Sequence, residues 1–119
     1  MPSFTDMLRE KILVFDGATG THLQGQHLTA DDFGGEHLNG CNEILVVSRP
    51  SAVQNVHRDY LEAGCDIIET NSFGSSSVVL VEYDIADRAY ELSYASARLA
   101  RELAQSYSTP SHPRFVAGS

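Results

Sequence analysis

The stretch DIIETNSF, residues 66–73, begins with apolar residues and then turns abruptly polar. A short apolar run that is rich in β-branched residues and does not alternate with polar ones is typical of a strand in a parallel sheet, buried on both faces. Glu69, Thr70 and Asn71 follow this run directly, and a core would have to satisfy each of their side chains separately. The stretch therefore predicts a buried strand with an unusually polar end.

Two other runs have the same character. KILVFDG, residues 11–17, and RFVAGS, residues 114–119, are almost continuously apolar and end in small or polar residues. All three runs are therefore predicted to be parallel strands.

Two amphipathic helices are predicted between these strands. In residues 48–64, Ser48 or Arg49 precedes a proline in the first turn, and Gly64 closes the last turn. The second helix starts at Asp84 as the N-cap and carries apolar residues at 3.6-residue spacing as far as Leu103. The order strand, helix, strand, helix, strand predicts an α/β fold with right-handed crossovers.

Two segments are harder to interpret. GSSSVVLVEY, residues 74–83, fits a strand by its valines or a short helix capped by its serines. Residues 20–47 are irregular, and within them ILVV, residues 44–47, is interpreted as a short extended piece.

The composition is that of one ordinary globular domain, with 42% hydrophobic and 20% charged residues among 119. Eight basic residues, scattered along the chain, stand against sixteen acidic ones, and the net charge is −8. This balance argues against nucleic acid and against anionic membranes as partners. The chain has neither a signal-peptide core nor an apolar run of spanning length, so we expect a cytoplasmic protein.

The third run ends with the chain at Ser119. Three parallel strands with two crossover helices would leave an apolar face and an open edge, which stable domains normally avoid. We therefore expect residues 1–119 to be the front part of a larger domain, truncated after its third strand.

The polar residues at the three strand ends should converge, because the carboxyl ends of parallel strands face the ligand crevice of an α/β fold. Asp16 is either a partner for the ammonium of an amino-acid ligand or a turn residue beside Gly17. Thr70 and Asn71 either hold a ligand or tie down the turn after the strand. Phe73 either packs on an apolar part of a ligand or belongs to the core.

A self-contained metal site is not expected. Cys41 lies four residues after His37, and Cys65 lies eight after His57, but neither spacing repeats and no Cys-x-x-Cys pair exists. Both cysteines are interpreted as small buried hydrophobic residues. The glycines of DGATGTHLQG match neither a dinucleotide-binding nor a phosphate-binding fingerprint.

The segments ILVFDGATGTHLQ, LTADDFGG, the run from GCNEILVV to VVLVEYDI, and RFVAGS resemble, in this order, the start of the homocysteine-binding barrel of cobalamin-dependent methionine synthases. The wider homocysteine S-methyltransferase family, with its betaine-dependent members, shares the skeleton. The resemblance implies the first three or so βα units of a (β/α)8 barrel. It also implies substrate-binding roles for Asp16 and Gly17 near the amino group of homocysteine, and for Thr70, Asn71 and Phe73 beside the substrate.

The resemblance further implies a zinc ion that activates homocysteine and a methyl group delivered by methylcobalamin, and ultimately by methyltetrahydrofolate, to give methionine. Folate and cobalamin domains would then be partners of the full-length protein. The zinc-binding cysteines of this family, which include an adjacent pair, come from later strands, and no Cys-Cys pair occurs here. We therefore expect no cofactor on this chain alone and no activity from it. The front end of a betaine-type or other cobalamin-independent enzyme, and a non-catalytic α/β binding module, are the alternatives.

Overall fold

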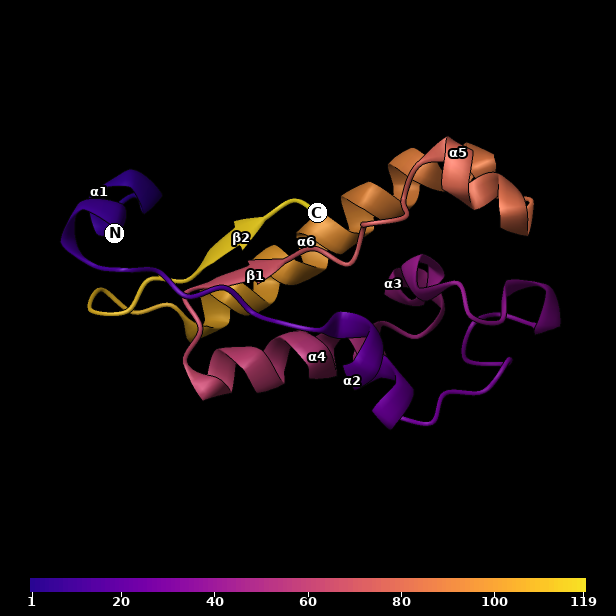
Figure 1. The fold of residues 1–119 in the computed structure, drawn as a ribbon, viewed down its shortest axis with the longest axis horizontal. Helices are drawn as coiled ribbons and strands as arrows, with labels where there is room; N and C mark the ends of the chain where they lie inside the picture. The colour runs from indigo at the N-terminus through magenta and orange to yellow at the C-terminus, as the bar shows by residue number, and fades with distance from the viewer.

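The computed structural model describes residues 1–119 and contains a small parallel sheet. Strands β1 (Ile67–Glu69) and β2 (Phe115–Ala117) lie side by side (Figure 1) and pair in register, Ile67 with Phe115 and Glu69 with Ala117. On the other side of β1, residue Phe15 forms a single parallel bridge with Ile67. The parallel arrangement of the three predicted runs is thus confirmed.

The prediction of a regular strand at residues 11–17 is wrong, because this segment is extended but carries only that one bridge. The side chains of Ile12 and Val14 are mostly exposed, and no neighbouring strand covers the outer edge of the segment. The ladder of main-chain bonds stops on both sides of this bridge, because the Val14 amide donates to the Asp66 side chain and the Glu69 amide donates to the Asp16 side chain.

The chain forms six α-helices, of which α4 and α6 pack against the strands: α1 (Phe4–Glu10), α2 (Thr19–Gly25), α3 (Leu45–Ser48), α4 (Pro50–Ala63), α5 (Ser77–Leu80) and α6 (Ala89–Tyr107). Four 3-10 helices complete the fold: η1 (Glu36–Leu38), η2 (Asn42–Ile44), η3 (Val81–Tyr83) and η4 (Ala86–Arg88). Helix α4 confirms its prediction. Pro50 stands in its first turn, and Gly64 ends it with a φ of 104°, a left-handed conformation that glycine adopts without strain.

Two other predictions fail. ILVV lies in η2 and α3 instead of an extended segment, because Ile44, Leu45 and Val46 are all buried and a helical turn lets these successive side chains pack into the core. Asp84 does not cap α6. It ends η3 in a left-handed conformation with a φ of 57°, and α6 begins only after η4.

The ambiguous segment at residues 74–83 is helical. The side chain of Ser76 accepts a hydrogen bond from the main-chain nitrogen of Val79, which caps α5, and η3 continues from its end. The serines at the front of the segment thus outweigh the strand preference of its valines.

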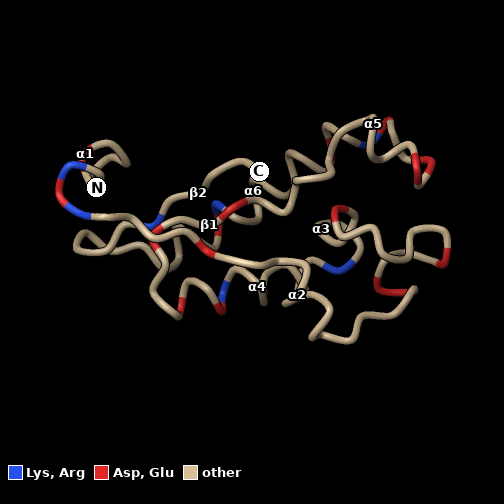
Figure 2. The backbone as a smooth tube through the Cα atoms, in the orientation of Figure 1, with Lys and Arg blue, Asp and Glu red and all other residues tan.

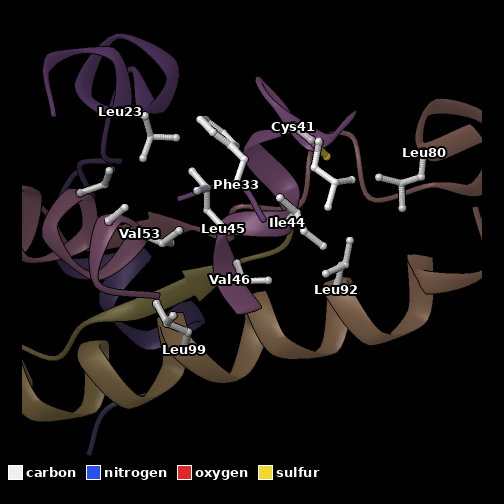
Figure 3. Packing of buried hydrophobic residues seen from close by; sticks show 13 residues of the cluster. Leu23, Phe33, Cys41, Ile44, Leu45, Val46, Val53, Leu80, Leu92 and Leu99 are labelled. Carbon is white, nitrogen blue, oxygen red and sulfur yellow. The ribbon is translucent and has the colours of Figure 1, made fainter. Parts of the chain in front are cut away.

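The main core lies between the α-helices and the irregular segment that follows α2 (Figure 3). It comprises thirteen buried residues: Leu23, Phe33, Leu38, Cys41, Ile44, Leu45, Val46, Ala52, Val53, Val56, Leu80, Leu92 and Leu99. A second cluster joins β1 to α4 and α6, and consists of Leu61, Cys65, Ile68, Ala100 and Ala104. Each buried leucine contributes about 2 kcal/mol relative to an exposed one. The main cluster therefore holds the helices together, and the second fixes β1 against α4 and α6.

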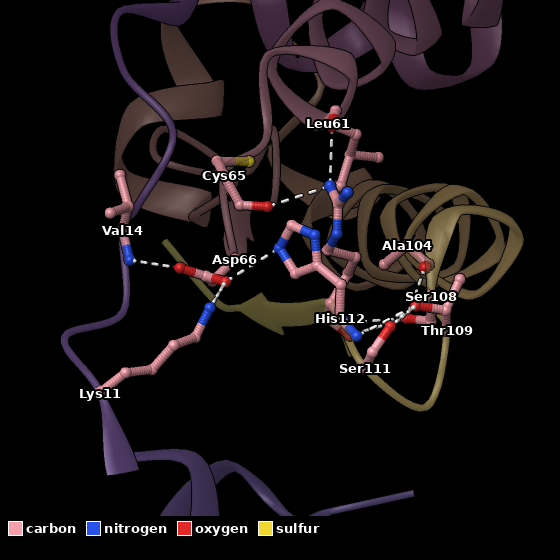
Figure 4. Close-up of polar contacts among 11 residues, drawn as sticks. Lys11, Val14, Leu61, Cys65, Asp66, Ala104, Ser108, Thr109, Ser111 and His112 are labelled. Atoms are coloured by element: carbon pink, nitrogen blue, oxygen red, sulfur yellow. Dashed lines mark hydrogen bonds and ion pairs between the residues drawn. The ribbon is translucent and has the colours of Figure 1, made fainter.

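The amino-terminal ends of the three extended segments are joined by the carboxylate of Asp66, which is only 3% exposed (Figure 4). It accepts hydrogen bonds from Lys11 Nζ at 2.7 Å and from the main-chain nitrogen of Val14 at 2.9 Å, and it lies 3.0 Å from His112 Nε2. Burial alone would raise the pKa of Asp66, but these partners hold it below its ordinary value. This network aligns the three segments at their amino-terminal ends. The polar residues stand at their carboxyl-terminal ends.

None of the helices combines the length and apolar character needed to cross a membrane. Acidic and basic residues are scattered over the backbone, with acidic ones more numerous, and long stretches of the chain carry neither (Figure 2).

Candidate functional site

The polar ends of the three extended segments meet at one edge of the sheet. The main-chain nitrogen of Asp16 donates to the carbonyl of Ile67 at 2.9 Å, and that of Thr70 donates to the carbonyl of Ala117 at 2.9 Å. Because both bonds continue the parallel register, the residues that follow each segment emerge on the same side. The structure thus brings together the strand ends that the sequence singled out.

Asp16 is half-buried at this edge, and its Oδ2 accepts a hydrogen bond from the main-chain nitrogen of Glu69 at 3.1 Å. Burial raises the pKa of Asp16 from its ordinary 3.8 to about 6; the Glu69 amide opposes this rise, and the Glu69 carboxylate adds to it. A half-buried carboxylate with one amide partner retains acceptor sites for a cationic ligand.

Gly17 lies against Tyr60 of α4. A Cβ atom at this position would stand 3.2 Å from Tyr60 Oη, and that hydroxyl donates to the carbonyl of Ala18 at 3.0 Å. Gly17 therefore serves the close packing of the turn after Asp16.

Thr70 is buried and links two of the strand ends. Its Oγ1 lies 2.6 Å from Ser72 Oγ and accepts a hydrogen bond from the main-chain nitrogen of Ser119 at 3.1 Å. Thr70 thus holds the residues after β1 beside those after β2.

The side chain of Asn71 also has a partner within the chain, because its Nδ2 donates a hydrogen bond to the carbonyl of Asn42 at 2.9 Å. Next to this bond, Glu43 Oε1 accepts a hydrogen bond from the main-chain nitrogen of Gly74 at 3.1 Å. Sequence reasoning missed Glu43, because it lies 31 residues from Gly74 along the chain in an irregular segment and no motif links the two.

A pocket of about 550 Å³ opens beside Thr70 between the strand ends and α6. Hydroxyl side chains dominate its lining, which comprises Thr70, Ser72, Phe73, Ser75, Ser76, Ser93, Ala97, Val116, Gly118 and Ser119. Phe73 is 90% exposed, so of the two roles weighed for it, a place in the core is wrong. Asp16, Gly17 and Asn71 do not line this pocket.

The residues of this chain do not fit a zinc centre. Cys41 and Cys65 are buried in separate hydrophobic clusters, and no group of three His, Cys, Asp or Glu side chains lies close enough to hold a metal ion. Burial raises the pKa of both thiols, which opposes the thiolate form that binds zinc.

Comparisons with known proteins agree with the resemblance. The sequence profile described as homocysteine S-methyltransferase matches residues 13–119. Methionine synthases of Mycobacterium leprae and Mycobacterium tuberculosis are each 47% identical over 114 residues, which is 96% of this chain but 9% of either relative.

The fold resembles the crystal structure of the homocysteine methyltransferase MmuM from Escherichia coli in its metallated form. The TM-score is 0.73 at 24% identity, over 94% of this chain and 38% of the other. This chain therefore belongs to the homocysteine S-methyltransferase family.

Proposed function

We propose that this chain forms the homocysteine-recognising part of a methionine synthase. One observation carries the proposal. In this member of the family, the half-buried Asp16 carboxylate and the hydroxyl groups beside Thr70 lie together where the three extended segments end. Homocysteine is a zwitterion whose side chain is two methylene groups ending in a thiol, and this edge offers a carboxylate, hydroxyl donors and an exposed aromatic ring, Phe73.

In this account the Asp16 carboxylate pairs with the ammonium group of homocysteine. Because Asp16 is half-buried, the pair lies in a medium of lower dielectric than water, where attraction between opposite charges is stronger. Gly17 keeps the turn close to Tyr60, and Asn71 fixes the segment after β1, so both position the site. Thr70 and the neighbouring serines offer hydroxyl groups to the substrate carboxylate.

The chemistry at the sulfur is assigned to residues outside this chain. A zinc ion bound in the complete protein would keep the homocysteine sulfur as a thiolate, but Cys41 and Cys65 lack the placement to hold it. Methylcobalamin as the methyl donor, methyltetrahydrofolate as its source and separate folate and cobalamin domains are supported by the 47% identity to two methionine synthases. The same identity favours this reading over a betaine-type enzyme. We assign the reaction to the cytoplasm, where thiols stay reduced.

The proposal includes a (β/α)8 barrel of which residues 1–119 are the first portion. Phe15, Ile67 and Phe115 lie at the same register level and, with Phe4 of α1, line an entirely apolar pocket of about 350 Å³ on one face of the sheet. Phe15 is 49% exposed. In a closed barrel, further strands would cover this face and the free edge of β2.

Calorimetric titration of the purified chain with homocysteine at pH 7.5 tests the function. We expect a dissociation constant on the order of 1 mM, because only part of the site is present. Asp16→Asn should weaken binding about tenfold by removing the charge that pairs with the ammonium. Asp31→Asn removes an equal charge at an exposed position and should leave binding unchanged. Equal affinity of the wild type and Asp16→Asn would refute the proposal.

A further inference from the structure

The exposure of Phe73 is not explained by the stability of the fold. Its side chain is 90% exposed, although burying a phenylalanine is worth about 2 to 3 kcal/mol. A single exposed apolar side chain is ordinary on a protein surface, but this one lines the pocket beside Thr70 and stands on a fixed backbone.

The backbone around Phe73 is indeed fixed, and from two sides. On one side, Asn71 donates to the carbonyl of Asn42, and Glu43 accepts from the main-chain nitrogen of Gly74. On the other side, Ser93 Oγ of α6 donates to the carbonyl of Ser75 at 3.3 Å. Residues 71–75 therefore have little freedom, while the one aromatic ring among them stays in solvent at the rim of the pocket.

Glu43 is fitted closely to this segment. A Cβ atom at Gly74 would lie 2.6 Å from Glu43 Oε1 and 3.3 Å from Val79 Cγ1, so only glycine lets the carboxylate reach the amide. Gly74 is buried, and without Glu43 its N–H would lose its partner in a place that water reaches poorly.

We propose that Glu43 is a positioning residue for substrate recognition: it holds residues 71–75 so that Phe73 stands over the pocket and contacts the side-chain methylene groups of homocysteine. This inference rests on the proposed function for the identity of the ligand. The fixing of Phe73 by Glu43 is a property of the chain by itself.

Four variants test the proposal. Glu43→Ala removes the acceptor, Glu43→Gln keeps an oxygen for the Gly74 amide, and Phe73→Ala removes the exposed ring. Glu82→Ala is the control, because it removes the same charge from an exposed position on η3. We expect Glu43→Ala and Phe73→Ala each to weaken homocysteine binding about fivefold to tenfold, and the two other variants to bind within about twofold of the wild type.

The double variant separates positioning from mere stability. If Glu43 acts through Phe73, combining Glu43→Ala with Phe73→Ala should weaken binding no more than either change alone. A general loss of structure would instead lower the melting temperature without this non-additivity. Independent, additive effects, or unchanged homocysteine affinity in a folded Glu43→Ala variant, would overturn the proposal.

Nuclear magnetic resonance relaxation tests, without homocysteine, whether Glu43 fixes the backbone at Phe73. The main-chain amides of Phe73 and Gly74 should become mobile on the fast timescale in Glu43→Ala and stay ordered in Glu43→Gln. Unchanged order in Glu43→Ala refutes the positioning role. Absence of homocysteine binding in the wild type, together with a mobile Phe73 in Glu43→Ala, would refute the proposed ligand and retain the role of Glu43 in fixing Phe73.

Discussion

Asp16 makes both the stability of the chain and its affinity for homocysteine depend on pH. Because the pKa of Asp16 is raised to about 6 in the fold, the protonated form stabilises the folded state; this contribution is complete below the ordinary 3.8 and is lost as the pH rises through about 6. Homocysteine binding should show the opposite trend, since only ionised Asp16 pairs with an ammonium group. Thermal melts and titrations between pH 4.5 and about 7.5 check both. Asp16→Asn should flatten the binding profile and leave stability rising with pH, because the titration of buried His57 then remains. Stability that still falls as the pH rises in that variant would contradict the assignment.

His57 is 1% exposed on α4, and neither ring nitrogen has a hydrogen-bond partner. Burial lowers the pKa of His57 to about 4, so the neutral ring contributes its full stability above its ordinary 6.5, and this is lost as the pH falls through about 4. His57→Leu removes two unpaired polar atoms at similar volume and should raise the free energy of unfolding at pH 7 by about 1 kcal/mol. Urea unfolding measures the change. A loss of stability in His57→Leu would show that the ring has a partner in solution.

Asp66 joins three segments, so its removal should weaken the contacts of all three and lower the stability of the fold. Asp66→Ala leaves Lys11, the Val14 amide and His112 without their common acceptor and should lower the free energy of unfolding by about 2 to 3 kcal/mol. Asp31→Ala, at an exposed position, should cost less than about 0.5 kcal/mol. Denaturant unfolding compares the two. Similar losses in both variants would contradict a structural network at Asp66.

Helix α4 was predictable from sequence because its signals are local: a proline in the first turn, a stripe of apolar residues and Gly64 at the end. The parallel pairing of β1 and β2 followed from their apolar runs. The N-cap at Asp84 was mispredicted because that residue instead closes η3, a 3-10 turn that precedes the helix. Sequence patterns over a few neighbouring residues therefore predicted the elements whose ends are set by residues close to them in the sequence.

The candidate site was only partly predictable for the same reason. Asp16 and Thr70 stand directly after apolar runs, where the topology of parallel strands sends polar residues to one edge. Glu43 and Ser93 act through bonds to the main chain of residues far along the sequence, and no spacing rule encodes such contacts. The exposure of Phe73 likewise depends on how that segment is held.

For the molecule as a whole, the separation of the two cysteines predicts that this chain alone binds no stoichiometric zinc. Cys41 and Cys65 lie in different clusters, and burial favours their protonated thiols by raising the pKa of each. Metal analysis after dialysis against zinc should find much less than one ion per chain, and methyl transfer to homocysteine should be undetectable. Tight one-to-one zinc binding would contradict this account.

The proposal that this chain is part of a barrel can be tested at the apolar face of the sheet, which further strands would cover. A polypeptide that carries the rest of the homologous domain of the Mycobacterium tuberculosis methionine synthase should bind this chain and cover Phe15 and Phe115. Size-exclusion chromatography detects the complex, and Phe15→Ser should weaken it. Tyr90→Ser, at an exposed position of α6, is the control. If both variants form the complex equally well, this face is not the one that is covered.

The central claim is that homocysteine binds where the strand ends meet, and a two-dimensional amide spectrum recorded during titration with homocysteine tests it most directly. The account predicts saturable shifts of the Glu69, Thr70 and Ser119 amides, at concentrations up to about ten times the expected dissociation constant. The amide signals of Asp66 and His112, at the opposite, amino-terminal ends of the strands, should not shift. Shifts confined to those opposite ends, or no saturable shift at all, would contradict the account.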